Sequence, residues 1–131
     1  MGIDAKIWGP HVWFFLHSVC ITYPDKPSNI EIKTMQNAIE GVSKIIPCEI
    51  CREHFVNAVN NGIKIKNKEI LSPLNFNILS SRKKLFRWMY DFHDFVNRYK
   101  VSDVKTISPS FEKVVEYWNI MLTNKDDMLI Y

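Results

Sequence analysis

Apolar residues recur at helical spacing through nearly the whole of this 131-residue chain. Between positions 28 and 46 they lie three or four residues apart, at Ile32, Met35, Ile39, Val42 and Ile46, and so share one face of a helix. Alternation of apolar and polar residues, the pattern of a half-buried strand, never persists beyond four residues. The pattern therefore predicts an all-α fold, and the length of the chain suits one domain.

Local signals mark where the predicted helices begin and end. Ser28 and Glu31 form an S-x-x-E capping box at the start of the helix just described. Pro47 stops that helix, because a proline excludes helical geometry at the residue before it. A short helix follows, which residues 61–62 (Asn-Gly) can end.

The remaining segments complete a predicted helical bundle. Pro10 suits the first turn of an N-terminal helix, and Ser80 or Ser81 can cap a long helix later in the chain. Residues 108–109 open the last helix, whereas the lysine-rich residues 63–72 are expected to form a loop. The expected architecture is a four-helix bundle with a short fifth helix.

Charge and composition argue against several classes of protein. The net charge is only +3, without the dense basic face or the motif of a nucleic-acid binder. The longest apolar stretch, residues 12–23, is interrupted by polar residues and is too short to span a bilayer. Residues 1–7 lack the features of a signal peptide. We therefore expect a soluble protein with neither nucleic acid nor membrane as a partner.

The run Pro47-Cys48-Glu49-Ile50-Cys51 is the clearest chemical motif in the chain. A purely structural disulfide across so short a loop would contribute only about 2 kcal/mol. A zinc site needs four ligands, and Cys48, Cys51 and His54 supply at most three. Covalent haem attachment needs a histidine directly after the second cysteine, where this chain has arginine.

A redox-active pair is the interpretation that the position of Cys48 favours. Pro47 ends one helix and the next begins at the cysteines, so the helix dipole can stabilise a thiolate there. Arg52 is expected to add positive charge nearby. A thiolate exchanges with substrate disulfides and thiols. Because a thioredoxin fold requires βαβ units that are missing here, a helical dithiol protein would carry its own electron acceptor.

Two pairs of aromatic and polar residues suggest where such an acceptor could bind. Trp13 and His17 are spaced i, i+4, as are His93 and Asn97, with Trp88 about one turn before the second pair. Together they could line a slot for a planar heteroaromatic ligand. Spacing alone favours the simpler alternative, in which the tryptophans are core residues and the histidines are buried and hydrogen-bonded.

Taken together, these motifs resemble the Erv/ALR flavin-linked sulfhydryl oxidases in their short, single-domain form. The match runs in order from about residue 8 to residue 118. The segments that carry it are WGPHVWFFLH at 8–17, YPDKP at 23–27, PCEIC at 47–51, Trp88 with HDFVN at 93–97, and Trp118.

The resemblance implies a single domain over residues 1–131, with a core of about 8–122 and FAD held at the end of the bundle. It also implies a homodimer. Cys51 would lie next to the flavin, and Cys48 would be the outer cysteine that meets the substrate. The residues expected around FAD are Gly9, Trp13, His17, Trp88, His93, Asn97 and Trp118, with Lys100 the first choice for its phosphates.

The implied activity is disulfide formation in protein dithiols or in a thioredoxin-like carrier. Electrons would pass through the Cys48–Cys51 pair and FAD to O2, giving hydrogen peroxide, and no metal would take part. Two alternatives remain open at this point. One is a non-catalytic helical interaction module that binds zinc, and the other is a flavin-free disulfide carrier.

The chain departs from the family pattern in ways that carry further expectations. Asp94 stands where the family usually has asparagine, and an anion facing FAD would weaken a phosphate contact. Cys20, the remaining cysteine, is expected to be buried and inert. The short form and the lack of a shuttle cysteine pair are typical of enzymes from large cytoplasmic DNA viruses. The expected location is thus the host cytoplasm or the virion, with the mitochondrial intermembrane space as the alternative.

Overall fold

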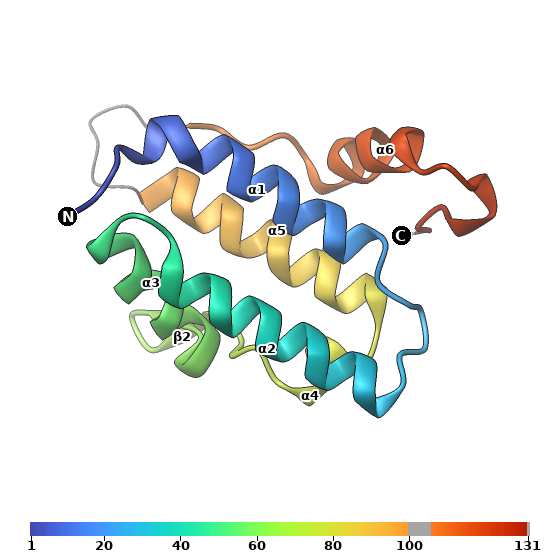
Figure 1. Ribbon diagram of the computed structural model, residues 1–131, viewed down its shortest axis with the longest axis horizontal. Helices are drawn as coiled ribbons and strands as arrows, with labels where there is room; N and C mark the ends of the chain where they lie inside the picture. The colour runs from blue at the N-terminus through green and yellow to red at the C-terminus, as the bar shows by residue number, and fades with distance from the viewer. Residues whose placement is uncertain (100–105, 131) are drawn as a thin grey trace.

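The computed structural model describes residues 1–99 and 106–130 and shows a helical bundle with one helix set apart at its side (Figure 1). α1 packs against α5, α2 packs against α3, and the one-turn α4 contacts both α2 and α5. The elements are α1 (Ala5–Ile21), α2 (Asn29–Ile45), α3 (Glu49–Asn61), β1 (Ile63–Ile65), β2 (Lys68–Leu71), α4 (Phe76–Leu79), α5 (Arg82–Tyr99), α6 (Phe111–Met121) and the 3-10 helix η1 (Lys125–Asp127). The predicted helical bundle with a short additional helix, α6, is confirmed.

α2 shows how well the local signals work where they are complete. The Ser28 side chain accepts a hydrogen bond from the Glu31 backbone, and the Glu31 carboxylate accepts one from the Ser28 backbone. The helix ends at Ile45, and Ile46 has the extended backbone that the following proline requires. Ile32 and Ile39 are buried, as the apolar spacing predicts.

The predicted start of the first helix was wrong. α1 begins at Ala5, where the Asp4 carboxylate accepts a hydrogen bond from the Lys6 backbone at 2.9 Å. Pro10 therefore lies inside the helix rather than in its first turn. Its missing N–H leaves one intrahelical bond unmade, and the helix tolerates this loss within the bundle.

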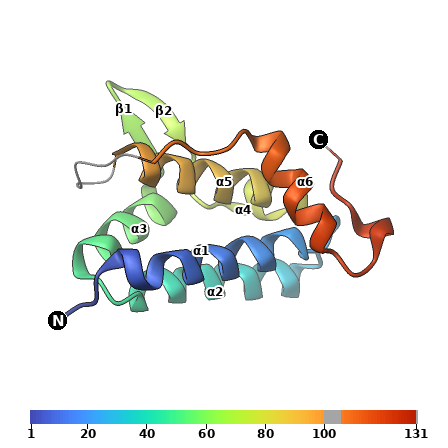
Figure 2. The same ribbon diagram turned by 90° about the horizontal axis from the view of Figure 1, so that it is seen from above.

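The prediction of a loop over residues 63–72 was also wrong. β1 and β2 form an antiparallel hairpin that projects from the bundle in Figure 2. Its two-residue turn consists of Lys66 and Asn67, both with positive φ (51° and 64°). Such a turn is usually marked by glycine, and its absence hid the hairpin in the sequence.

The last two long helices begin with serine caps. Ser81 accepts a hydrogen bond from the Lys84 backbone and so caps α5, one of the two positions predicted. Ser110, rather than residues 108–109, caps α6 by accepting from the Lys113 backbone. Pro109 precedes that cap, and its carbonyl accepts a hydrogen bond from the Tyr90 hydroxyl at 2.6 Å.

Arg82 joins three parts of the fold at the start of α5. It is 5% exposed, and its guanidinium donates to the Asp25 carboxylate at 2.8 Å and to the Ile21 carbonyl at 2.9 Å. A further hydrogen bond reaches the Asp127 carbonyl in η1. One side chain thus holds the end of α1, the α1–α2 connection and the C-terminal segment together. In the described part of the chain, no helix has both the length and the apolar character to cross a membrane.

Candidate active site

Cys48 and Cys51 form a disulfide at the N-terminus of α3. Cys48 is the N-cap residue, and its sulfur accepts a hydrogen bond from the Cys51 backbone at 3.3 Å. The predicted position of the pair at a helix start is therefore confirmed. Free backbone N–H groups and the helix dipole favour a thiolate here once the disulfide opens.

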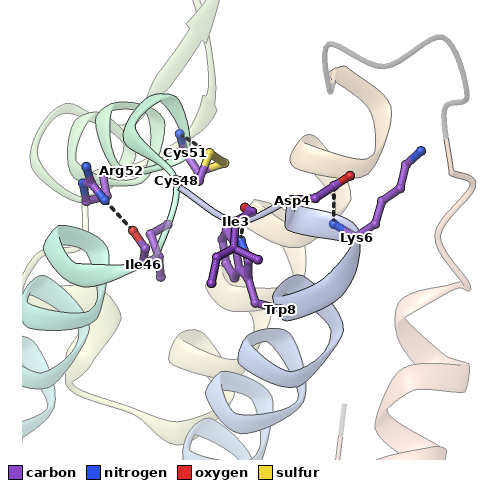
Figure 3. The surroundings of a disulfide bond; sticks show 8 residues. All are labelled: Ile3, Asp4, Lys6, Trp8, Ile46, Cys48, Cys51 and Arg52. Carbon is purple, nitrogen blue, oxygen red and sulfur yellow. Dashed lines mark hydrogen bonds between the residues drawn. A yellow bond between two sulfur atoms is a disulfide. The ribbon is translucent and has the colours of Figure 1, made fainter. Parts of the chain in front are cut away.

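The two cysteines and Arg52 have different surroundings (Figure 3). Cys51 packs against the hydrophobic core, whereas Cys48 lines an open surface cleft. Arg52 does not support the sulfurs as the sequence suggested. Its guanidinium turns to the other side of the helix and donates to the Ile46 carbonyl at 2.8 Å, so it caps the end of α2 instead.

A continuous row of aromatic side chains leads from Cys51 into the bundle. Phe55 lies one turn after Cys51 on α3 and contacts Phe92 of α5, with ring centroids 4.8 Å apart. Phe92 in turn contacts Trp13 of α1 at 5.6 Å and Trp88 at the same distance. Packed rings thus extend from α3, the helix that carries the redox pair, to the residues expected to hold an acceptor.

Four of the predicted residues form one ring cluster. Trp13 stacks on His93, with centroids 4.1 Å apart and planes within 12°. His17 lies 5.3 Å from His93, and its ring faces Trp118 of α6 at 6.2 Å with planes within 10°. Residues from α1, α5 and α6 therefore meet here, although they are up to 105 positions apart in the chain.

His17 is held in one neutral form within this cluster. It is 4% exposed, and this burial lowers its pKa from the ordinary value. Its Nδ1 lies 2.8 Å from the Trp13 carbonyl, an acceptor, so the proton is on Nδ1 and Nε2 carries a lone pair. The ring can therefore accept a hydrogen bond from a ligand.

Gly9 is a buried residue of α1 with open space at its Cβ position. It lies on the same face of α1 as Trp13 and His17, one and two turns earlier, and it is buried. A Cβ atom placed on Gly9 would nevertheless meet nothing within 4 Å. Open space at a buried glycine, beside stacked rings and a histidine acceptor, fits a flavin nucleotide.

The structure places the other predicted residues at the edge of this cluster or outside it. Trp88 is buried, contacts Phe92, and donates from Nε1 to the Ser72 carbonyl at 2.8 Å. Asn97 donates to the Ser108 hydroxyl at 3.0 Å. Lys100 lies outside the described residues.

Asp94 does not stand alone beside the cluster. Its carboxylate pairs with Arg98 one turn later at 2.9 Å. The ion pair balances the negative charge of Asp94, which stands where the family usually has asparagine. Arg98 also places a positive charge on this part of α5. In the sequence, the i, i+4 spacing of the two residues was the signal for this pair.

Cys20 and the zinc alternative are also addressed by the geometry. Cys20 is fully buried, and burial raises the pKa of its thiol, so it is not positioned to react.

Across residues 1–99 and 106–130, no three His, Cys, Asp or Glu side chains gather as a metal site would require. The zinc alternative therefore has no geometric support in this part of the chain.

Sequence reasoning missed several residues of the site. Phe55 and Phe92 complete the row of rings, and the i, i+4 spacing of Cys51 and Phe55 was the available signal. Residues 2–4 lie beside Cys48, and no sequence pattern pointed to this contact between positions more than 40 apart. Only the fold brings them to the disulfide.

Comparison with known proteins agrees with this geometry. The model of the Erv1 / Alr family matches residues 10–119, which is most of the chain. The chain belongs to the Erv1 / Alr family. The family resemblance seen in the motifs is thereby confirmed.

Individual relatives come from viruses and from plants. The chain is 31% identical over 97 residues to protein 096R of Invertebrate iridescent virus 3, which is named for FAD-linked sulfhydryl oxidase activity. This match covers 74% of the chain and 58% of the viral protein. ERV1 of Arabidopsis thaliana, an FAD-linked sulfhydryl oxidase by name, is 30% identical, over 69% of the chain and 40% of that protein. The chain thus spans about half the length of these relatives.

A solved structure supports the fold. The FAD binding domain of Erv1 from Saccharomyces cerevisiae superimposes with a TM-score of 0.64 and 26% identity. The superposition covers 95% of this chain and 97% of that domain.

Proposed function

We propose that this chain is an FAD-dependent thiol oxidase that makes disulfides in other molecules. Residues 1–131 would form one domain of this class, with its core at about 8–122. The observation that carries the proposal is the Cys48–Cys51 disulfide at a helix start, joined by packed rings to a ring cluster with open space beside it. The names of the viral and plant relatives support the same activity.

The exchange chemistry follows from the different positions of the two sulfurs. A substrate thiolate attacks Cys48 and forms a mixed disulfide, while the Cys48–Cys51 bond breaks and Cys51 leaves with the electron pair. The start of α3 stabilises this Cys51 thiolate. A second substrate thiol then attacks the mixed disulfide, releases the substrate disulfide and leaves Cys48 reduced. FAD, when bound, supplies the acceptor for the two electrons of the reduced pair and passes them to O2 as hydrogen peroxide.

The ring cluster would hold and orient the cofactor. Gly9, Trp13 and His17 present one face of α1, and the His17 Nε2 lone pair would accept a hydrogen bond. We also propose His93, Asn97 and Trp118 as FAD-binding residues. Trp88, which contacts Phe92, would lie close to the cofactor, and Lys100 would neutralise the FAD phosphates.

The absorption spectrum is the most direct test of this function. The purified protein should be yellow, with flavin bands, and should consume O2 when dithiothreitol is added. A colourless protein that stays inactive after FAD is supplied would overturn the proposal. Thiol exchange without O2 consumption would instead indicate a flavin-free disulfide carrier.

We further propose that two copies of the chain form a homodimer through α1 and α2. A groove of about 390 Å³ lies between these helices, with Leu16, Val19, Met35 and Val42 in its lining. Phe15 at its edge is 57% exposed, which is costly for a phenylalanine in water. Sedimentation should give the mass of two chains, and Met35→Glu should give the mass of one. A wild-type protein that sediments as a single chain at micromolar concentration would exclude the dimer.

The viral relatives support a proposal for the electron donors and for the location. We propose protein dithiols, or a separate thioredoxin-like carrier, as donors in the cytoplasm of an infected host cell or in the virion. The mitochondrial intermembrane space is the alternative, since relatives also include the mitochondrial ERV1 of yeast. Immunolabelling of infected cells would distinguish these locations.

A further inference from the structure

An open cleft lies directly over Cys48. It has a volume of about 480 Å³, and its walls come from the start of α3 and from the segment that precedes α1. Its lining consists of Gly2, Ile3, Asp4, Cys48, Glu49, Ile50 and Glu53. The cleft therefore includes Cys48, one of the two cysteines of the disulfide, in its lining.

Two hydrogen bonds hold the segment before α1 in place beside the disulfide, and Figure 3 shows the second of them. The Ile3 backbone N–H donates to the Pro47 carbonyl at 2.8 Å. The Trp8 indole donates to the Ile3 carbonyl, also at 2.8 Å. Because this segment is hydrogen-bonded to Pro47, the residue before Cys48, both walls of the cleft are held in place by the fold.

The charges that line the cleft all have one sign. Glu49 and Glu53 contribute carboxylates, and no lysine or arginine is among the lining residues. Asp4 also lines the cleft, but its carboxylate accepts a hydrogen bond from the Lys6 backbone and points away from the sulfurs. Two side-chain cations near the disulfide point elsewhere. Arg52 turns to the Ile46 carbonyl, and the Lys6 side chain extends away from the sulfurs. A substrate approaching Cys48 therefore meets a negative field.

This field matters because the attacking group is itself an anion. A substrate thiolate beside the carboxylates of Glu49 and Glu53 is repelled, unless positive charge on the same substrate compensates. Lysine or arginine next to the substrate cysteine would do this, and would also lower the pKa of that cysteine and raise its thiolate fraction. Ile3 (54% exposed) and Ile50 (52% exposed) add apolar surface that a free small thiol would not cover.

We propose that this cleft is the substrate-binding site and that it selects polypeptide dithiols with basic residues next to the reactive cysteine. Glu49 and Glu53 are the specificity-determining residues, and Ile3 and Ile50 contact apolar side chains of the same segment. The proposal rests on the thiol oxidase function above and names its substrate class. The chemical step is unchanged: the substrate sulfur bonds to Cys48, and Cys51 leaves with the electron pair.

Two reduced peptides with the same pair of cysteines test this selection. One carries lysines next to the cysteines and the other carries glutamates, and kcat/KM is measured for each by O2 consumption with the flavin-loaded protein. The wild type should prefer the basic peptide at low salt, and the preference should shrink at high salt because exposed charges are then screened. Glu49→Gln with Glu53→Gln should reduce the preference about fivefold, mainly through KM.

A matched control is available on another helix. Glu112 and Glu116 have the same i, i+4 spacing in the first turns of α6, and both are exposed. Their double replacement by glutamine changes the net charge equally, so it should leave the preference unchanged. All rates are divided by the rate with neutral dithiothreitol, which removes any change in the disulfide itself. The flavin spectrum of each variant shows that it is folded.

The outcomes separate this inference from the function on which it rests. Equal kcat/KM for the two peptides, or a preference that persists in the Glu49 and Glu53 variant, would overturn the inference while dithiothreitol oxidation continues. A wild-type protein that oxidises none of the three donors would instead overturn the oxidase function. Charge reversal by Glu49→Lys with Glu53→Lys should turn the preference toward the acidic peptide.

Discussion

Replacing Cys51 by serine is expected to lower dithiol-driven O2 consumption by at least about a thousandfold while leaving FAD bound. A serine hydroxyl can neither form the disulfide with Cys48 nor leave as a stabilised anion when a substrate thiolate attacks. The ring cluster that would hold FAD does not include Cys51, so the flavin absorbance of the purified variant should equal that of the wild type. Oxygen electrode traces and an absorption spectrum on the same sample provide both measurements.

Cys20→Ala is the matched control for this experiment. Cys20 is fully buried on α1 and is separated from the disulfide in the structure, so turnover per bound flavin should not change. The role assigned to Cys51 would be contradicted if the serine variant kept turning over at the wild-type rate. Loss of flavin together with turnover would instead place Cys51 in the support of the cofactor site.

Arg82→Met is expected to lower the free energy of unfolding by about 2–4 kcal/mol. The guanidinium is the hydrogen-bond donor to the Ile21 and Asp127 carbonyls, and methionine fills similar space without any donor. The Ile21 carbonyl then stays buried without this partner, which is the larger part of the cost. Urea unfolding followed by circular dichroism measures the change, provided that both proteins are compared at the same flavin occupancy.

One further variant separates the contribution of the Arg82 carbonyl contacts from that of the Arg82–Asp25 ion pair, and a second serves as a comparison at an exposed ion pair. Asp25→Asn removes the charge of a carboxylate that is 75% exposed, so it should cost less than about 1 kcal/mol. Arg98→Met breaks the Arg98–Asp94 pair, in which the arginine is 67% exposed, and should cost similarly little. If Asp25→Asn destabilised the protein as strongly as Arg82→Met, the ion pair and not the carbonyl contacts would be the source of the stability.

Helix prediction succeeded where short-range signals were complete. The capping box at Ser28 and Glu31 and the stop at Pro47 involve neighbours in the chain, so their geometry is set locally. The two errors have the same origin. Pro10 is tolerated inside α1 because tertiary packing stabilises that helix. The Lys66-Asn67 turn adopts positive φ without glycine, and Trp88 anchors its hairpin through the Ser72 carbonyl.

The candidate site was predictable to a similar extent. The i, i+4 pairs Trp13/His17 and His93/Asn97 were each predicted to share a helix face, and Trp13, His17 and His93 do meet in the ring cluster. Spacing within one helix cannot show which other helix a face will meet, so the contact of Trp13 with His93 required the packing of α1 on α5. The i, i+4 spacing of Asp94 and Arg98 indicated their ion pair, but it did not exclude that Asp94 faces a ligand, since both orientations keep the helix intact.

For the Cys48–Cys51 pair, the sequence alone determined its chemistry and its position at a helix start. Both follow from a few adjacent residues, because a proline, a cap and a helix dipole act within one turn. Tertiary structure decided everything that requires distant parts of the chain to meet. Packing directed Cys51 toward the core and its aromatic rings, and the pinned segment at Ile3 built an acidic cleft over Cys48. The physical reason is that burial and electric field depend on which surfaces come together, and no local pattern in a sequence contains that information.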